Sequence, residues 1–333
     1  METSESLIEK AIERLTKGGD GDVRRDVDRR SRTDTPSLVD GGVGAIEDDS
    51  PVDRDLQMRG GTGNAVISVA LPWLPRTAGG KSREVEIDLD RLEKLGFLTP
   101  KGRNKRLAEE LRVIKRRVLM NAVDLTQKRA DTGGVILVTS AMPGEGKTFL
   151  AVNLAISIAM EIDRTALLID ADPVKARLTR VLGLRSYAGL ADVISGGEPD
   201  LHKVLLSTNI GRLKILPSGA RRADMSEYVG SRRTELLIKE LALRYPDRIV
   251  VVDSPPLLAT VEACSLARMV EQVVVVVETE RTKRSDLITA LNLLEPSKTI
   301  GLVLNKANER EETKYYESYL SVPNDSGEML SNK

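Results

Sequence analysis

Between residues 134 and 306, short runs of Val, Ile and Leu alternate with segments of helical pattern such as 231–244 and 282–294. Strands that are apolar along their whole length are typical of a parallel sheet covered by helices on both faces. We therefore predict a doubly wound α/β domain with a mainly parallel sheet, from about residue 85 to residue 308. The predicted strands are 135–140, 165–172, 213–219, 248–256, 272–278 and 299–306.

The first predicted strand runs into the turn Ala-Met-Pro-Gly-Glu-Gly-Lys-Thr at 141–148, and a helical pattern follows. This is the spacing of a P-loop, whose main-chain N–H groups surround phosphate oxygens at a helix N-terminus. A glycine-rich turn with an exposed lysine would not need a strand before it and a helix after it. We expect Lys147 to reach the β- and γ-phosphates of ATP and the Thr148 hydroxyl to coordinate Mg²⁺. The expected nucleotide-binding residues are Met142, Pro143, Gly144, Glu145, Gly146, Lys147, Thr148 and Phe149.

Aspartates stand at the ends of two later predicted strands. Asp253 ends the apolar part of 248–256, where it fits the Walker B role of holding Mg²⁺ or a water bound to it. Asp170 and Asp172 end 165–172, and residues two apart on a strand point the same way. A kinase that acts on a hydroxyl needs an Asp to orient the acceptor and take its proton. An Asx turn at the strand end is the plainer alternative for this pair.

The flanking segments differ from the domain in composition. Residues 1–17 predict a short amphipathic helix, either a frayed terminus or a docking helix for a partner. Residues 18–84 are rich in charge and glycine and predict a disordered linker. Residues 309–333 predict a flexible, polar tail. It carries three of the six tyrosines of the chain, which are Tyr315, Tyr316 and Tyr319.

Composition excludes several classes of function. The 50 Lys and Arg residues balance 50 Asp and Glu residues, which argues against a nucleic-acid-binding protein. One cysteine and one histidine rule out an intrachain disulfide framework and a His or Cys metal cluster. No apolar run is long enough to predict a transmembrane helix. We therefore expect a cytoplasmic protein whose chemistry depends on carboxylates, lysine and hydroxyl groups.

Together these motifs resemble the bacterial tyrosine kinases of the polysaccharide-export type, P-loop NTPases related to MinD and ParA, and most closely the exosortase-associated (XrtA-type) autokinases. The resemblance rests on SAMPGEGKT, LLIDAD, VVVDSPPLLATVEA and the tyrosine cluster of the tail. In a helix predicted at about 104–127, Glu109, Arg112 and Lys115 occupy the family's ExxRxxR oligomerisation motif, with Lys in place of the last Arg. Val174 stands where the family often has an Arg.

The resemblance implies an ATP- and Mg²⁺-dependent autokinase that regulates exopolysaccharide synthesis or export. Lys147, Asp170 and Asp172 would be catalytic, and Thr148 and Asp253 would hold the metal. A neighbouring subunit of a homo-oligomer, such as a ring, would phosphorylate the tail tyrosines. The implied partners are a membrane polysaccharide co-polymerase (chain-length determinant protein) as activator and a tyrosine phosphatase. These partners would place the chain at the inner face of the cell membrane.

The sequence leaves two alternative functions open. One is a MinD/ParA-like positioning ATPase, whose loop has a second lysine five residues before the P-loop lysine. Met142 stands at that position here, which argues against this class. The other is a nucleotide-gated scaffold of a polysaccharide co-polymerase, with negligible chemistry of its own.

Overall fold

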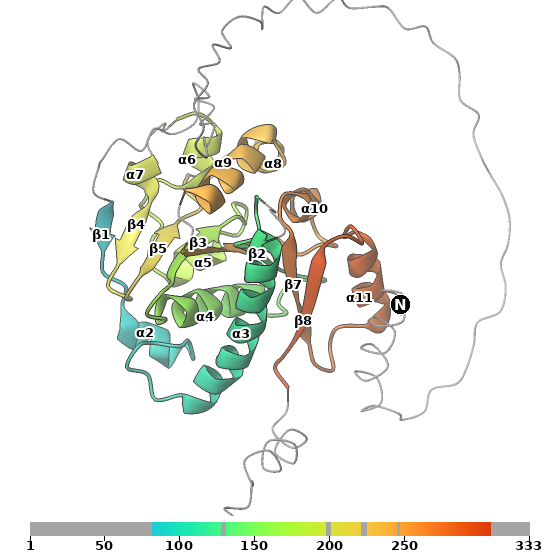
Figure 1. The fold of residues 1–333 in the computed structure, drawn as a ribbon, viewed down its shortest axis with the longest axis horizontal. Coiled ribbons are helices and arrows are strands. Elements are labelled where there is room, and N and C mark those ends of the chain that lie inside the picture. Colours follow the sequence, from blue (N-terminus) through green and yellow to red (C-terminus); the bar gives the residue numbers. More distant parts are fainter. Residues whose placement is uncertain (1–81, 128–130, 198–200, 221–224, 245–246, 308–333) are drawn as a thin grey trace, which may run out of the picture. The chain divides into compact units, whose positions relative to one another are not determined.

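The computed structural model describes residues 82–127, 131–197, 201–220, 225–244 and 247–307 (Figure 1). The helix predicted at 1–17 and the tail predicted at 309–333 lie outside the described residues. So does the predicted linker at 18–84, except for its last residues. Two of these, Arg83 and Glu84, belong to a strand that runs to Val85.

A sheet of eight strands forms the centre of the described part of the chain, in the order β1-β4-β5-β3-β6-β2-β7-β8. Every neighbouring pair is parallel except β4 and β5, which are antiparallel. This confirms the predicted doubly wound, mainly parallel sheet. The strands are β1 Arg83–Val85, β2 Val135–Ser140, β3 Thr165–Asp170, β4 Leu206–Thr208, β5 Leu213–Leu216, β6 Arg248–Asp253, β7 Gln272–Glu278 and β8 Thr299–Asn305.

Helices cover both faces of the sheet (Figure 1). Alternate residues of a strand point to opposite faces, so β2 divides its apolar side chains between two cores. Val135 and Leu137 pack with residues of α6 to α11, whereas Ile136 and Val138 pack with residues of α2 to α5. The helices are α2 Leu89–Lys94, α3 Lys105–Gln127, α4 Lys147–Ala159, α5 Arg177–Val181, α6 Leu190–Ile194, α7 Leu201–Val204, α8 Met225–Val229, α9 Arg232–Leu243, α10 Val261–Arg268 and α11 Arg284–Asn292.

Helix α4 is buried on nearly all sides, which is typical of a helix enclosed within a domain. Helix α3 covers its outer side and is also tied to the sheet. The Asn121 side chain donates to Gln272 Oε1 over 3.0 Å, and Gln272 Nε2 donates to the carbonyl of Val118 over 3.2 Å. This packing fixes the N-terminus of α4 at the carboxyl end of β2. Among the described helices, none combines the length and the apolar character that a membrane span requires.

Candidate nucleotide site

The loop between β2 and α4 has the backbone geometry that a P-loop requires. Gly144 and Gly146 have φ angles of 96° and 103°, a region that residues with a Cβ rarely adopt. A Cβ on Gly146 would lie 1.9 Å from Nδ2 of Asn305, so a side chain there would also require the Asn305 amide to move. Helix α4 begins at Lys147, and its N-terminus therefore faces the loop. Such an N-terminus favours a bound anion such as phosphate.

The strand order brings the carboxylates to this loop. Strand β6 lies between β2 and β3, and Asp170 is the direct neighbour of Asp253 in the register of β3 and β6. Both aspartates are fully buried, and Asp172 lies two residues after the end of β3. Carboxyl ends of parallel strands are the usual ligand-binding edge of an open α/β sheet. The structure thus brings together the P-loop and all three carboxylates predicted from the sequence.

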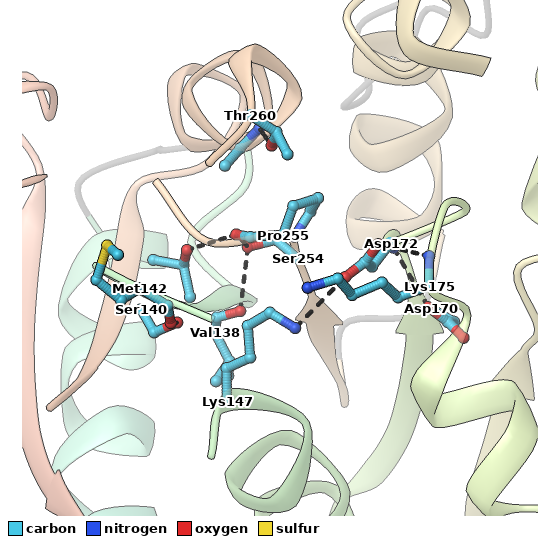
Figure 2. Close-up of polar contacts among 12 residues, drawn as sticks. Val138, Ser140, Met142, Lys147, Asp170, Asp172, Lys175, Ser254, Pro255 and Thr260 are labelled. Atoms are coloured by element: carbon cyan, nitrogen blue, oxygen red, sulfur yellow. Dashed lines mark hydrogen bonds and ion pairs between the residues drawn. The ribbon is translucent and has the colours of Figure 1, made fainter. Parts of the chain in front are cut away.

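Lys147 points along this edge toward Asp172 (Figure 2). Its Nζ lies 3.5 Å from Oδ2 of Asp172, and both side chains are buried. A buried charge is costly unless it is paired, so Asp172 stabilises the ammonium group where the nucleotide phosphates are expected. The other oxygen of Asp172 accepts the main-chain N–H of Lys175 over 3.1 Å, which orients the carboxylate.

Asp170 has different neighbours. Its Oδ2 accepts both the main-chain N–H of Thr179, over 2.8 Å, and the Thr179 hydroxyl, over 2.6 Å. Burial raises the pKa of Asp170 to about 6, and the hydrogen bonds from Thr179 limit the rise. Asp170 therefore anchors the start of α5 and the turn after β3. The sequence did not indicate Thr179, because its hydroxyl reaches Asp170 through a tertiary contact.

The side chains of Asp253 and Thr148 fit a magnesium site. Both carboxylate oxygens of Asp253 and the hydroxyl of Thr148 are buried, and no hydrogen bond of ordinary geometry reaches them in the described part of the chain. Burial raises the pKa of Asp253 to about 7, while the nearby Lys147 and Thr148 oppose the rise. Mg²⁺ usually binds one or two carboxylates together with phosphates and water, so this small set of hard oxygen ligands suits it. Within the described residues, no group of three or more His, Cys, Asp or Glu could bind a metal without such additional ligands.

The remaining loop residues have distinct surroundings. Met142 is exposed, and its main-chain N–H donates a hydrogen bond to Oε2 of Glu145 over 2.8 Å. This N–H is therefore not directed at a phosphate. Its carbonyl accepts the Ser140 hydroxyl over 2.8 Å (Figure 2). The ring of Phe149 packs against Phe97 with centroids 5.0 Å apart, which leaves only its main chain for a nucleotide contact. Pro143 is partly exposed at the tip of the loop.

The three positions of the predicted oligomerisation motif lie on α3 but do not share one environment. Glu109 and Arg112 are exposed. Lys115 instead points to the neighbouring helix, where its Nζ donates to the Ser157 carbonyl over 3.2 Å and pairs with Glu161. The sequence places all three residues on one helix but does not show that Lys115 is engaged within the subunit. The predicted phosphorylation sites Tyr315, Tyr316 and Tyr319 lie outside the described residues.

Comparisons with known proteins agree with this geometry. A family model described as an AAA domain matches residues 133–302. The tyrosine-protein kinase CpsD of Streptococcus agalactiae is 30% identical over 178 residues, which are 53% of this chain and 76% of that protein. The succinoglycan biosynthesis transport protein ExoP of Rhizobium meliloti is 34% identical over 187 residues, or 54% of this chain and 23% of that longer protein.

Among solved structures, the chimerical protein CapA2B2 superimposes with a TM-score of 0.54 and 25% sequence identity. The match covers 67% of this chain and 100% of that one. The fold, the P-loop and the aligned relatives therefore point to the same class of protein.

Proposed function

The chain belongs to the bacterial tyrosine kinase family, and we propose that it transfers the γ-phosphoryl group of ATP to tyrosines in its own C-terminal tail. The observation that carries this proposal is the position of Lys147 and three buried carboxylates beside one P-loop. ATP binding alone needs the loop, the lysine and one carboxylate for the metal. The additional carboxylate Asp172, which faces Lys147, suits an enzyme that must also accept a proton from a hydroxyl.

Binding of the nucleotide follows from the loop. Main-chain N–H groups at the start of α4 would bind the phosphates, and Lys147 would exchange its contact with Asp172 for a phosphate oxygen. Thr148 and Asp253 would hold Mg²⁺, which supplies positive charge to offset the charge on the β- and γ-phosphates. This assignment is supported by the buried oxygens of both side chains, which no hydrogen bond of ordinary geometry reaches within the described residues.

Proton transfer is assigned to Asp172. A free tyrosine has a pKa of about 10, so near neutral pH its hydroxyl needs a nearby base. The Oδ2 atom of Asp170 already accepts two hydrogen bonds from Thr179, whereas Asp172 lies beside the lysine that would face the γ-phosphate. Asp172 is therefore the better candidate for the base, and Asp170 is assigned to positioning.

The proposed acceptors are Tyr315, Tyr316 and Tyr319. A polar terminus with three tyrosines within five residues has no evident use for them in packing a core. Transfer between subunits implies a homo-oligomer, to which Glu109 and Arg112 on the exposed side of α3 would contribute. Lys115 would contribute less than the motif suggests, because it is bound to α4 and Glu161.

Partners are proposed from the family and from ExoP. In that polysaccharide transport protein the aligned segment is about a quarter of a longer chain. A separate membrane co-polymerase would then supply here what the rest of such a chain supplies there, and would hold this protein at the inner face of the membrane. A tyrosine phosphatase would remove the phosphates from the tail. The closer link to exosortase-associated autokinases is part of this proposal.

Mixing two full-length variants, one without the tail tyrosines and one without the P-loop lysine, tests whether the tail is the substrate. A variant with Tyr315, Tyr316 and Tyr319 changed to Phe keeps the P-loop, and Lys147→Met keeps the tail. Neither alone should give tail phosphotyrosine with Mg·ATP, whereas the mixture should phosphorylate the tail of Lys147→Met. ATP hydrolysis by the wild type with no phosphotyrosine, even with the membrane activator added, would favour the positioning ATPase. Tight ATP binding with neither ATP hydrolysis nor phosphotyrosine would favour the nucleotide-gated scaffold.

A further inference from the structure

Glu145 lies inside the phosphate loop and is almost fully buried, with 1% of its surface exposed. Its Oε2 accepts the N–H of Met142, three residues earlier in the loop, over 2.8 Å. Its Oε1 accepts a hydrogen bond from the hydroxyl of Thr282, in the turn between β7 and α11. One carboxylate thus closes the loop on itself and joins it to a turn 137 residues away in the sequence.

Thr282 is itself fixed on the opposite side. Its Oγ1 accepts the main-chain N–H of Glu278, at the end of β7, over 2.9 Å. Its own N–H donates to the Glu278 carbonyl over 3.0 Å. Because the hydroxyl donates to one partner and accepts from the other, it connects the loop to a strand of the central sheet. Valine has the same shape as threonine but can do neither.

A second contact holds the loop from β8. Nδ2 of Asn305 donates to the Glu145 carbonyl over 2.8 Å, and Nζ of Lys306 donates to the Gly144 carbonyl over 3.1 Å. Lys306 also pairs with Glu278 over 2.9 Å. The Gly144–Gly146 segment, which contains two residues of positive φ, is therefore attached to the ends of both β7 and β8. Two glycines give a loop many alternative shapes when it is not held.

We propose that Thr282 is a positioning residue, and that its hydrogen bond to Glu145 keeps the loop in the shape that binds nucleotide. This inference rests on the proposed function only in taking 141–148 as the nucleotide site. Thr282 lies outside the 141–148 loop and is not among the residues expected to contact the nucleotide. It acts by raising the fraction of molecules whose loop is ready to bind, since apparent affinity falls in proportion to that fraction.

The expected effect is on binding and not on the chemical step. Loss of a hydrogen bond to a buried carboxylate changes an equilibrium by roughly tenfold or more. Thr282→Val should therefore raise the Kd for a fluorescent ADP analogue, and the KM for ATP, by about tenfold with kcat nearly unchanged. Thr282→Ser keeps the hydroxyl and should restore both values to within about threefold of the wild type.

The experiment measures ADP-analogue binding, tyrosine phosphorylation kinetics and thermal unfolding on the full chain. Thr289→Val is the matched control. Among the described residues its hydroxyl bonds only to the Ser285 carbonyl, within α11, over 2.8 Å, so the affinity of this variant for the ADP analogue should not change. If Thr282→Val does not fold, Thr282→Ala removes the hydroxyl without placing a methyl group beside the Glu145 carboxylate, and it carries the same prediction. Wild-type affinity in a Thr282 variant that has lost the hydroxyl would overturn the inference. A lower melting temperature with unchanged KM, or a lower kcat with unchanged KM, would also overturn it.

The two proposals can fail separately. If the wild type binds the ADP analogue and Thr282→Val binds it equally well, only the role of Thr282 is rejected. If the wild type binds no nucleotide at all, the nucleotide site itself is rejected, and with it the proposed kinase.

Discussion

Asp170 and Asp172 are separated by one residue, yet their side chains have different neighbours. Asp170 faces Thr179 and the start of α5, while Asp172 faces Lys147. Asp253, on the adjacent strand, faces Thr148 and Lys147 and has no hydrogen bond of ordinary geometry within the described residues. The residue types alone do not separate these roles, because all three are aspartates at strand ends. Their roles differ because each carboxylate has different neighbouring groups in the folded chain.

We predict that Asp172→Asn lowers tyrosine phosphorylation by at least about 100-fold, because the proton acceptor is removed. The Kd for the ADP analogue should change little. Asp170→Asn should lower the rate much less, since an amide oxygen can still accept from Thr179. Phosphorylation rates of the two variants at saturating ATP provide the comparison. A larger loss in Asp170→Asn than in Asp172→Asn would reverse the assignment.

Because the pKa of Asp253 is raised by burial, we predict that the stability of the protein depends on pH. Its pKa is about 7 in the folded protein against 3.8 for an ordinary Asp, so the folded state holds a proton that the unfolded state has released. Without metal or nucleotide, this group should destabilise the protein progressively as pH rises from about 4 to about 7. Asp253→Asn should therefore raise the melting temperature at pH 8 and raise it less at pH 5. Equal gains at both pH values, measured by thermal unfolding in EDTA, would contradict the shifted pKa.

At the scale of elements, the sequence predicted the six long apolar strands of the sheet and the long helix α3. It missed β1 and β4, which have only three residues each and therefore show no clear period. It also missed that β4 and β5 are antiparallel, because pairing direction depends on the connection between strands. The P-loop and the three aspartates were predictable because each lies at the end of a predicted strand. Thr179 and Thr282 were not, because single hydroxyls from distant segments have no sequence period.

The contact between α3 and α4 gives a prediction for Lys115. Lys115→Met should lower the free energy of unfolding by about 1 kcal/mol, because it leaves the Ser157 carbonyl and Glu161 without this partner. For a domain of this size that corresponds to about 2–4 °C in melting temperature. Arg117→Met, at an exposed position of the same helix outside the predicted oligomerisation motif, is the matched control and should not change stability. An unchanged melting temperature in Lys115→Met would mean that this lysine does not hold α3 onto α4.

In the whole molecule, the carboxyl edge of the sheet holds the proposed catalytic residues, and the proposed acceptor tyrosines follow its last described strand in the sequence. Strand β8 ends at Asn305, whose side chain contacts the phosphate loop, and the segment with the three tyrosines follows in the sequence. That segment contains Glu309, Glu311, Glu312 and Glu317, and each phosphate would add about −1.5 to −2 charges to it. Phosphorylation would therefore repel neighbouring tails and favour separation of the subunits.

Phosphorylation of the tail is tested by incubating the purified protein with Mg·ATP, with and without its membrane activator, and mapping phosphotyrosine by mass spectrometry. Lys147→Met removes the ammonium group that is proposed to bind phosphate, and Lys175→Met changes an exposed lysine nearby as the matched control. We predict phosphate on Tyr315, Tyr316 or Tyr319 in the wild type and in Lys175→Met, and none in Lys147→Met. Bound or hydrolysed ATP with no phosphotyrosine under either condition would contradict it.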